Sequence, residues 1–444
     1  MSNKTNCKLC DIIESFVPGD WGNESCSDDT NNNVFCVRGA DIVPILNNDF
    51  TKIPTRYISN KSLNEKKLKA GDIVIEKSGG SPVQSTGRAV FITEKLIEEK
   101  SSIVCSNFCV AIRIKKTWNP KFVFYYWQHL YNSGVFFNFE GKTSGIKNLQ
   151  LENALQAITI PDFPLSLQKN ISDVISIIDR KIALIREINR NLEALARQLY
   201  DYWFVQFDFP DENGRPYKSS GGKMVWNDKL KREIPEGWNV GTLLDIAKFT
   251  NGLACQKHRP TDEKKLPVIK IKEMHDGITS ETEYVKSDIP EDVKVFDGDV
   301  LFSWSASLEV MLWCYGNGGL NQHIFKVSSN NGFPRSFYFF NLKDYIIHFK
   351  RMAEARKTTM GHITQDHLKQ SAIAIPQNPV IPIEFERKTI GIFNSIILYN
   401  QGIIELTKQR EELLPLLMNG QVNCDLSIIL FQFFVPFEGM TAAP

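Results

Sequence analysis

Two groups of residues in the sequence have side chains suited to catalysis on nucleic acids. Asp72 lies shortly before Glu76 and Lys77, and carboxylates beside a lysine are what a metal-dependent nuclease requires. The segment Asn119-Pro120-Lys121-Phe122 places an amide and a proline ahead of an aromatic ring. Such groups can grip the amino group of a base flipped out of the double helix. Either group would make the chain an enzyme that acts on DNA.

An internal repeat argues against both enzymes. The second half of the chain has Ser303-Trp304 at the place of Glu76-Lys77, and Gly332-Phe333-Pro334-Arg335 without the asparagine. Pro120 is then better explained as the first residue of a helix. The sequence has no G-x-x-x-x-G-K-[ST] phosphate loop, and its seven histidines show no metal-ligand spacing. We therefore predict no catalytic residue, no metal site and no cofactor in this chain.

Side chains that can read DNA bases recur instead in loops at matching places of the two halves. Arg, Lys, Asn, Gln and Ser recognise base edges in the major groove, whereas a phosphate needs only a positive group nearby. A solvated surface role is the commoner outcome for any one of them, so the recurrence carries the prediction. The DNA-binding candidates are Arg38, Lys77, Ser78, Ser81, Arg88, Asn107, Lys142, Thr143, Ser144, Lys270, Ser303, Trp304, Ser305, Gln322, Arg356, Lys357, Thr358, Thr359 and His362.

The repeat itself is visible as matching blocks in the same order. Gly71-Asp72 and Gly298-Asp299 each form a turn that leads into an apolar strand. Arg38 and Lys270 share one slot, and Asn107 and Gln322 share another. Other matching blocks open each copy (Leu9-x-Asp11-Ile12, Leu243-x-Asp245-Ile246) and close it (Ile158-x-Ile160-Pro161, Ile373-x-Ile375-Pro376). A repeat of this length is the pattern of an internal duplication and indicates two similar domains.

A long helical pattern follows each copy. In the first, apolar residues step by three and four from Ile171 to Leu199 without Gly or Pro, and the second is similar from Ile390 to Leu417 with Gly402 inside it. Helices of this length reach roughly 50–60 Å. Two of them can bury their stripes on each other as an antiparallel coiled coil. The aromatic residues Tyr200, Tyr202, Trp203 and Phe204 beyond the first stripe are candidates for a partner interface, with packing inside the domain as the alternative.

These elements predict a mixed α/β (α+β) fold: two similar globular domains, each followed by a long helix, with the helices paired in pseudo-twofold symmetry. The boundaries we expect are a first domain at 1–164, a central spacer helix at 165–207, a linker at 208–237, a second domain at 238–380, a C-terminal spacer helix at 381–420 and an apolar tail at 421–444. Trp226 and Trp238 suggest that the linker packs on the protein.

Composition narrows the class of protein. With 444 residues, 42% hydrophobic and 23% charged, the chain is neither disordered nor fibrous. No apolar run is long enough to span a membrane and the N-terminus is polar, so we expect a soluble cytoplasmic protein with its nine cysteines reduced. The formal net charge is +1, so DNA binding would depend on local patches.

The Gly-Asp turns, the Ile-x-Ile-Pro strand ends and the segment from Asp179 to Trp238 together resemble the DNA-specificity subunit of Type I restriction–modification enzymes. The resemblance covers about residues 5–420. It implies that each domain reads one half of a bipartite, asymmetric double-stranded DNA site and that the helices set the gap between the halves. It also implies a non-catalytic subunit that carries two adenine methyltransferase subunits and restriction subunits, with S-adenosylmethionine, ATP and Mg²⁺ belonging to those partners. Two alternatives stay open: a coiled-coil scaffold that does not read DNA, and a self-sufficient methyltransferase or nuclease.

Overall fold

The computed structural model describes residues 6–79, 84–143, 146–305, 307–355, 363 and 365–421. The chain forms two compact units, which are described separately. The first unit contains residues 1–183 and 406–444, and the second unit contains residues 184–405. Both long helices therefore begin in one unit and end in the other.

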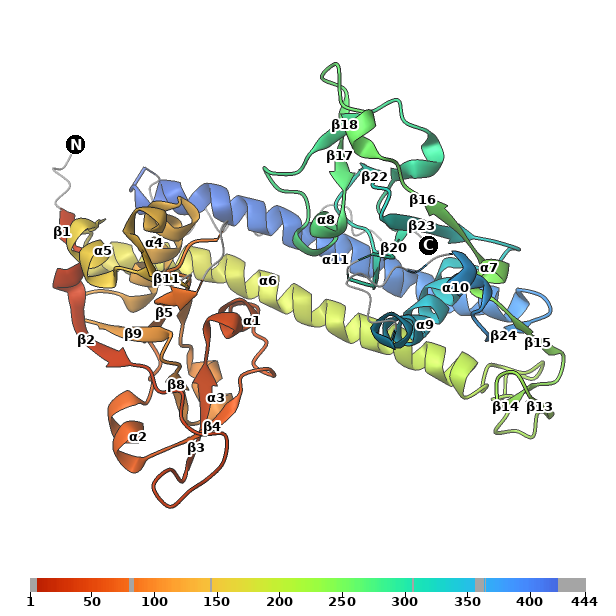
Figure 1. The fold of residues 1–444 in the computed structure, drawn as a ribbon, viewed down its shortest axis with the longest axis horizontal. Helices are drawn as coiled ribbons and strands as arrows, with labels where there is room; N and C mark the ends of the chain where they lie inside the picture. The colour runs from red at the N-terminus through yellow and green to blue at the C-terminus, as the bar shows by residue number, and fades with distance from the viewer. Residues whose placement is uncertain are drawn as a thin grey trace. The chain divides into compact units, whose positions relative to one another are not determined.

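The first unit is built on two small sheets (Figure 1). One sheet is antiparallel, in the order β2 (Ile13–Pro18), β9 (Cys109–Ile114), β5 (Ile73–Glu76), β7 (Ala89–Phe91). The other has the order β4 (Thr55–Ile58), β3 (Asn32–Val37), β8 (Ile103–Cys105), and β3 pairs with β8 in parallel. A smaller sheet joins β10 (Glu140–Thr143), β11 (Ile146–Leu149) and β6 (Ser78–Gly79). Short helices cover the unit: α1 (Ile42–Leu46), α2 (Asn60–Lys66), α3 (Glu94–Lys100), α4 (Pro120–Asn132) and α5 (Leu151–Ala157).

The second unit repeats this plan. Its antiparallel sheet has the order β16 (Ala247–Asn251), β23 (Ile324–Ser329), β20 (Val300–Ser303), β21 (Glu309–Leu312). The other sheet has the order β18 (Tyr284–Lys286), β17 (Lys265–Ile269), β22 (Gly318–Leu320), β19 (Lys294–Val295), and again the central pair, β17 with β22, is parallel. The helices are α7 (Leu243–Ile246), α8 (Ile271–Asp276), α9 (Arg335–Ala355) and α10 (Gln365–Lys369). The four-stranded antiparallel sheets have the same order in both units, and the second sheets share a parallel pair, to which the second unit adds β19. These shared features confirm the predicted duplication.

Each unit is closed by a strand pair that joins its start to its end. β1 (Asn6–Lys8) pairs with β12 (Thr159–Pro161), and β15 (Trp238–Gly241) pairs with β24 (Ile373–Pro376), both antiparallel. The Ile-x-Ile-Pro segments therefore end each domain as edge partners of its first strand. At α4, the Asn119 side chain accepts a hydrogen bond from the Phe122 N–H (2.9 Å) and Pro120 opens the helix. The Asn-Pro segment is thus a helix cap, as the repeat predicted.

The two Gly-Asp turns have the same hydrogen bonds. Gly71 and Gly298 have φ of +94° and +88°. The Asp72 carboxylate accepts from the Lys69 N–H, and the Asp299 carboxylate accepts from the Phe296 N–H, both at 2.8 Å. Each glycine is needed because its backbone takes a conformation that L-residues rarely adopt, and each aspartate holds the turn that feeds the central strand.

Substituting Gly71 with alanine isolates the cost of this backbone conformation. An added Cβ would meet no atom within 4 Å, so the strain of the positive φ is the only penalty. We expect G71A to lower the free energy of unfolding of the first unit by about 1–2 kcal/mol. Urea unfolding measures this, with the equally open Gly391→Ala as a control inside a helix, where alanine should stabilise. An unchanged free energy of unfolding in G71A would contradict the assigned turn.

The long helices α6 (Leu165–Tyr200) and α11 (Val380–Met418) lie side by side and antiparallel within each unit (Figure 1). In the first unit, Arg410 pairs with Asp179 (3.1 Å), while Leu414 and Leu417 share a core with Ile171 and Ile175. In the second unit, Asn189 donates to Asn400 (2.9 Å) and the Tyr200 ring contacts the Phe385 ring. These contacts confirm the antiparallel helix pair. Leu195 and Ile390, expected on the buried stripe, are exposed, so the apolar seam is narrower than predicted.

The linker is folded. A hairpin of β13 (Met224–Asn227) and β14 (Arg232–Pro235) occupies it, and the Trp238 ring stacks on Phe209 at 5.5 Å. Trp226, in contrast, leaves 57% of its surface exposed, so only one of the two tryptophans packs as predicted. The tail beyond residue 421 lies outside the described residues. Within the described part of the chain, no helix is long and apolar enough to cross a membrane.

Candidate nucleic-acid interface

In the first unit, several predicted base-reading residues come together where strands β3, β5 and β8 end. The Ser106 N–H donates to the Val37 carbonyl (2.9 Å), and the Lys77 N–H donates to the Phe108 carbonyl (2.8 Å). These bonds hold the segments of Arg38, Lys77 and Asn107 beside one another. The two sheets thus bring together Arg38 and Asn107, which lie about 70 positions apart in the sequence.

Arg88, another predicted DNA contact of this unit, forms a buried ion pair with Glu76. Its guanidinium donates twice to the Glu76 carboxylate (2.6 and 2.8 Å), and the two side chains expose 18% and 4% of their surface. The hydrogen bonds to Glu76 raise the pKa of Arg88. A Cβ on Gly39 would lie 2.3 Å from Glu76 Oε1, so the backbone also packs tightly on this pair. This corrects the prediction for Arg88, because its donors are used inside the protein.

Arg38 and Lys270 are equivalent, as the repeat predicted. The Arg38 N–H donates to the Asp41 carboxylate (2.9 Å), and the Lys270 N–H donates to the Glu273 carboxylate (3.1 Å). The Arg38 side chain also binds Asp41 (2.8 Å), and Lys270 pairs with Glu283 (2.6 Å). Hydrogen bonding to Asp41 raises the pKa of Arg38. Both cations are half-exposed but partly neutralised, which weakens them as phosphate contacts.

The remaining described candidates of the first unit are more accessible. Asn107 is exposed and Lys77 is half-buried, and among the described residues no carboxylate forms an ion pair with Lys77. Ser78 bonds to Asn148 across the small sheet (2.5 Å). Asn107 and Lys77 thus remain the best polar groups for an external ligand in this unit.

In the second unit, the structure removes two serines from the candidates. Ser303 and Ser305 are buried, and the Ser303 hydroxyl donates to the Ser307 carbonyl (2.5 Å). A buried hydroxyl is poorly placed to reach a base edge, so burial disfavours both serines as DNA contacts. Trp304 lies next to the turn that carries Gln322, and the backbone N–H of Trp304 donates to the His323 carbonyl (3.3 Å).

Other predicted residues cannot be placed. Ser81, Ser144, Arg356, Lys357, Thr358, Thr359 and His362 lie outside the described residues, and only the backbone of Lys142 and Thr143 is described.

The aromatic residues predicted as a partner interface are mostly internal. Tyr200, Trp203 and Phe204 are buried in the core of the second unit, where Phe204 contacts Phe337 and Phe385 at 4.9 and 5.1 Å. This corrects the interface prediction for these three residues, because the domain itself covers them. Tyr202 alone of the four is exposed, at 37%.

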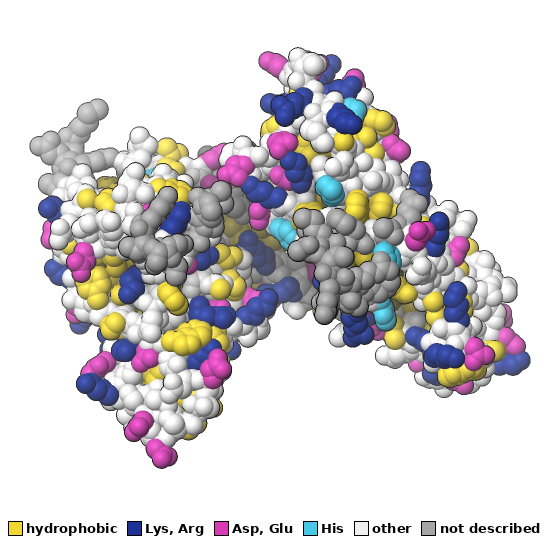
Figure 2. Space-filling model, in the orientation of Figure 1, with side chains coloured by type: hydrophobic (Ala, Val, Ile, Leu, Met, Phe, Trp, Pro, Cys, Tyr) yellow, Lys and Arg dark blue, Asp and Glu magenta, His cyan; other side chains and the backbone are white. Residues whose placement is uncertain are grey.

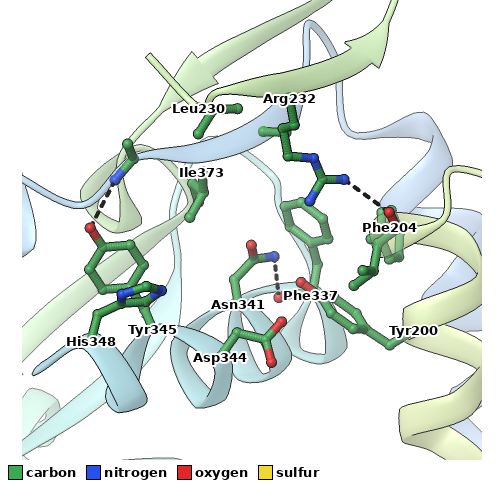
Figure 3. Close-up of a pocket in the computed structure, with 13 residues that line it drawn as sticks. Tyr200, Phe204, Leu230, Arg232, Phe337, Asn341, Asp344, Tyr345, His348 and Ile373 are labelled. Carbon is green, nitrogen blue, oxygen red and sulfur yellow. Dashed lines mark hydrogen bonds between the residues drawn. The ribbon is translucent and has the colours of Figure 1, made fainter. Parts of the chain in front are cut away.

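A cavity of about 200 Å³ lies beside this core, between the end of α6, the β13–β14 hairpin, α9 and β24 (Figure 3). Arg232 donates to the Val205 carbonyl (2.9 Å), and Asn341 donates to the Phe337 carbonyl (2.9 Å). Burial raises the pKa of Asp344 and lowers that of Arg232. Opposite charges and internally bonded polar groups give the cavity no evident preference for an anionic or a cationic ligand.

The surface charge is mixed. In Figure 2, Lys and Arg side chains alternate with Asp and Glu on the visible face of each unit, in keeping with the net charge of +1. No group of three or more His, Cys, Asp or Glu suited to a metal ion occurs among the described residues. Any DNA affinity of this chain must therefore come from short local elements.

Two aromatic residues that sequence reasoning missed lie at the candidate turns. Phe108 follows Asn107 and leaves 58% of its surface exposed, and His323 follows Gln322. Asn107 and Gln322 share a slot of the repeat, and the residue after each carries an aromatic ring, so the sequence signal for both rings lies one residue beyond that slot.

Comparisons with known proteins agree with the duplicated fold. A family model described as the Type I restriction modification DNA specificity domain matches residues 1–194 and 235–383. The Type I restriction enzyme MjaIX specificity subunit of Methanocaldococcus jannaschii is 24% identical over 282 residues, 62% of this chain and 62% of that protein. The HindI specificity subunit of Haemophilus influenzae is 23% identical over 320 residues, 60% of this chain and 69% of that protein. The match thus spans less than two thirds of the MjaIX subunit.

One solved structure shares the fold along most of the chain. The crystal structure of the S subunit of a Type I restriction–modification system from M. genitalium has a TM-score of 0.54 and 13% sequence identity. It covers 94% of this chain and 97% of that chain. Because the family model matches once in each half, over most of the sequence, this chain belongs to the family of Type I restriction modification DNA specificity domains.

Proposed function

We propose that this chain is the DNA specificity subunit of a Type I restriction–modification enzyme and that each unit reads one half of a bipartite, asymmetric site. The observation that carries the proposal is the duplication: two units whose antiparallel sheets have the same strand order each match the DNA specificity domain. Two similar but not identical reading surfaces suit a site whose halves differ in sequence. The helices α6 and α11 would then set the number of base pairs between the halves.

The chain acts in this proposal without chemistry of its own. The residues that could have formed catalytic sites have structural partners: Asn119 caps α4, Asp72 pairs with Arg113 (3.0 Å) and Glu76 pairs with Arg88. Adenine methylation with S-adenosylmethionine would belong to two modification subunits. Cleavage with ATP and Mg²⁺ would belong to restriction subunits, and the complex would work in the cytoplasm.

Single-molecule sequencing of the host's genomic DNA, with this gene intact and deleted, tests the proposal. We expect N6-methyladenine at one split, asymmetric motif in the intact strain and its complete loss on deletion. Re-expression of the full chain should restore the same motif. An unchanged methylome in a strain that expresses the gene and its partners would overturn the proposal, and methylation by the purified chain with S-adenosylmethionine alone would show an enzyme instead.

A further inference from the structure

We propose that an amide–aromatic turn, Asn107-Phe108 in the first unit and Gln322-His323 in the second, is the element with which each unit contacts base edges. This inference rests on the proposed function and names the residues that perform it. The expected ligand is an A·T base pair at a defined position of each half-site.

The two turns have the same backbone geometry. The backbone N–H of Ser106 donates to the Val37 carbonyl (2.9 Å), and the backbone N–H of Asn321 donates to the Ile269 carbonyl (3.1 Å). Val37 and Ile269 end the equivalent strands β3 and β17. Each turn closes with a second equivalent bond, from the Cys109 N–H to Ser106 (2.9 Å) and from the Ile324 N–H to Asn321 (3.1 Å). The two middle residues of each turn therefore occupy matching positions. The bonds that shape the turns join backbone atoms and do not use these side chains.

A third equivalent bond joins each turn to its neighbouring strand end. The Phe108 carbonyl accepts from Lys77, and the His323 carbonyl accepts from Trp304. Lys77 and Trp304 follow the strands β5 and β20 that the Gly-Asp turns begin. Each turn is thus anchored to both sheets of its unit, so a base contact there would be held by a rigid scaffold rather than by a loose loop.

The side chains at the middle positions suit base recognition. An Asn or Gln amide can donate to and accept from adenine together, at N6 and N7, and an aromatic ring can contact the methyl group of thymine. Phe108 exposes 58% of its surface, although a large apolar ring gains from burial. The Nδ1 atom of His323 is buried and has no hydrogen-bond partner among the described residues, while its ring lies 5.6 Å from that of Trp304.

The other polar groups near these turns are already satisfied. Arg88 binds Glu76, Arg38 binds Asp41 and Lys270 binds Glu283. Ser303 is buried. These neighbours have partners in other segments, whereas the Gln322 amide contacts only its neighbour in the same turn, the His323 ring (3.3 Å), among the described contacts. The two turns therefore remain, with Lys77 beside the first as a phosphate contact.

The test uses the assembled complex of the full chain with its modification subunits. Methylation rates are measured on duplexes in which each base pair of the recognised motif is changed singly. We expect N107A and F108A to reduce discrimination at one or two positions of one half-site by about 10-fold or more, and to leave the other half-site unchanged. Q322A and H323A should have the reciprocal effect, and F108Y, which keeps the ring, should retain most of the discrimination.

Matched controls separate base reading from general damage. Phe137→Ala and Trp226→Ala remove exposed aromatic rings elsewhere and should leave the preferences of both half-sites unchanged. Wild-type discrimination in all four turn variants would overturn the inference. So would loss of co-purification of the modification subunits with F108A, which would make the ring a protein contact. If the wild-type complex itself methylates no specific motif, the proposed function fails, whatever the variants do.

Discussion

Replacing Arg88 with methionine will lower the free energy of unfolding of the first unit by about 3 kcal/mol. The substitution leaves the Glu76 carboxylate, which is 4% exposed, without its two charge-assisted hydrogen bonds. Breaking a buried pair from one side is costly because the remaining charge keeps its desolvation penalty. We expect the low end of the usual range because Arg88 retains some contact with water. Urea unfolding of the full chain, followed by hydrogen exchange of the first unit, measures the effect.

Two further variants show whether the loss comes from the unpaired charge. The double variant E76Q/R88M removes both charges and should recover a large part of the stability. Lys95→Met breaks an exposed pair with Glu99 in the same unit and should cost less than about 1 kcal/mol. Equal losses for R88M and K95M would contradict a structural role of Arg88 and return it to the candidates for DNA contact.

Replacing Trp203 with alanine will destabilise the second unit by about 3–5 kcal/mol. Its ring is 4% exposed and lies 5.6 Å from the Phe385 ring of α11, inside the aromatic core of that unit. Removal of a buried tryptophan loses its transfer free energy and leaves a cavity that the surroundings only partly fill. Thermal and urea unfolding of the second unit will report the loss.

The adjacent Tyr202 is the matched control. Because it is exposed, Y202A should change stability by no more than about 0.5 kcal/mol. A reduced yield of partner subunits with Y202A, at unchanged stability, would support Tyr202, the exposed member of the four predicted interface residues, as a partner contact. A small effect of W203A on stability would contradict the assigned aromatic core.

Much of the fold could be predicted because the repeat exposes local signals twice. Gly71-Asp72 and Gly298-Asp299 share a turn that only glycine favours, and both precede apolar strands, so chemistry and position agree. The long helices were predictable from the spacing of their apolar residues and the lack of internal breakers in α6. The narrower seam at Leu195 and Ile390 was not, because helix periodicity marks a face and does not show how much of it a partner covers.

The site was less predictable because tertiary contacts decide which of its side chains are exposed and which have partners inside the protein. Arg88 looks like a surface cation in sequence, but the pairing of β5 with β7 brings it to Glu76. Ser303 looks like a loop hydroxyl, but its strand is fully covered. Tyr200 and Phe204 sit at the end of a helix, where sequence cannot distinguish an external anchor from a core that later elements complete.

The first unit is made of two chain segments far apart in the sequence, and this determines when it can fold during synthesis. Its core includes Leu414, Leu417 and Met418, which the ribosome makes roughly 230 residues after Ala183. At typical elongation rates the nascent first unit would wait on the order of 10–40 s for these side chains. The second unit, residues 184–405, is contiguous and can be completed first. A premature stop before Leu414 would therefore damage the first domain, which is translated more than 200 residues earlier.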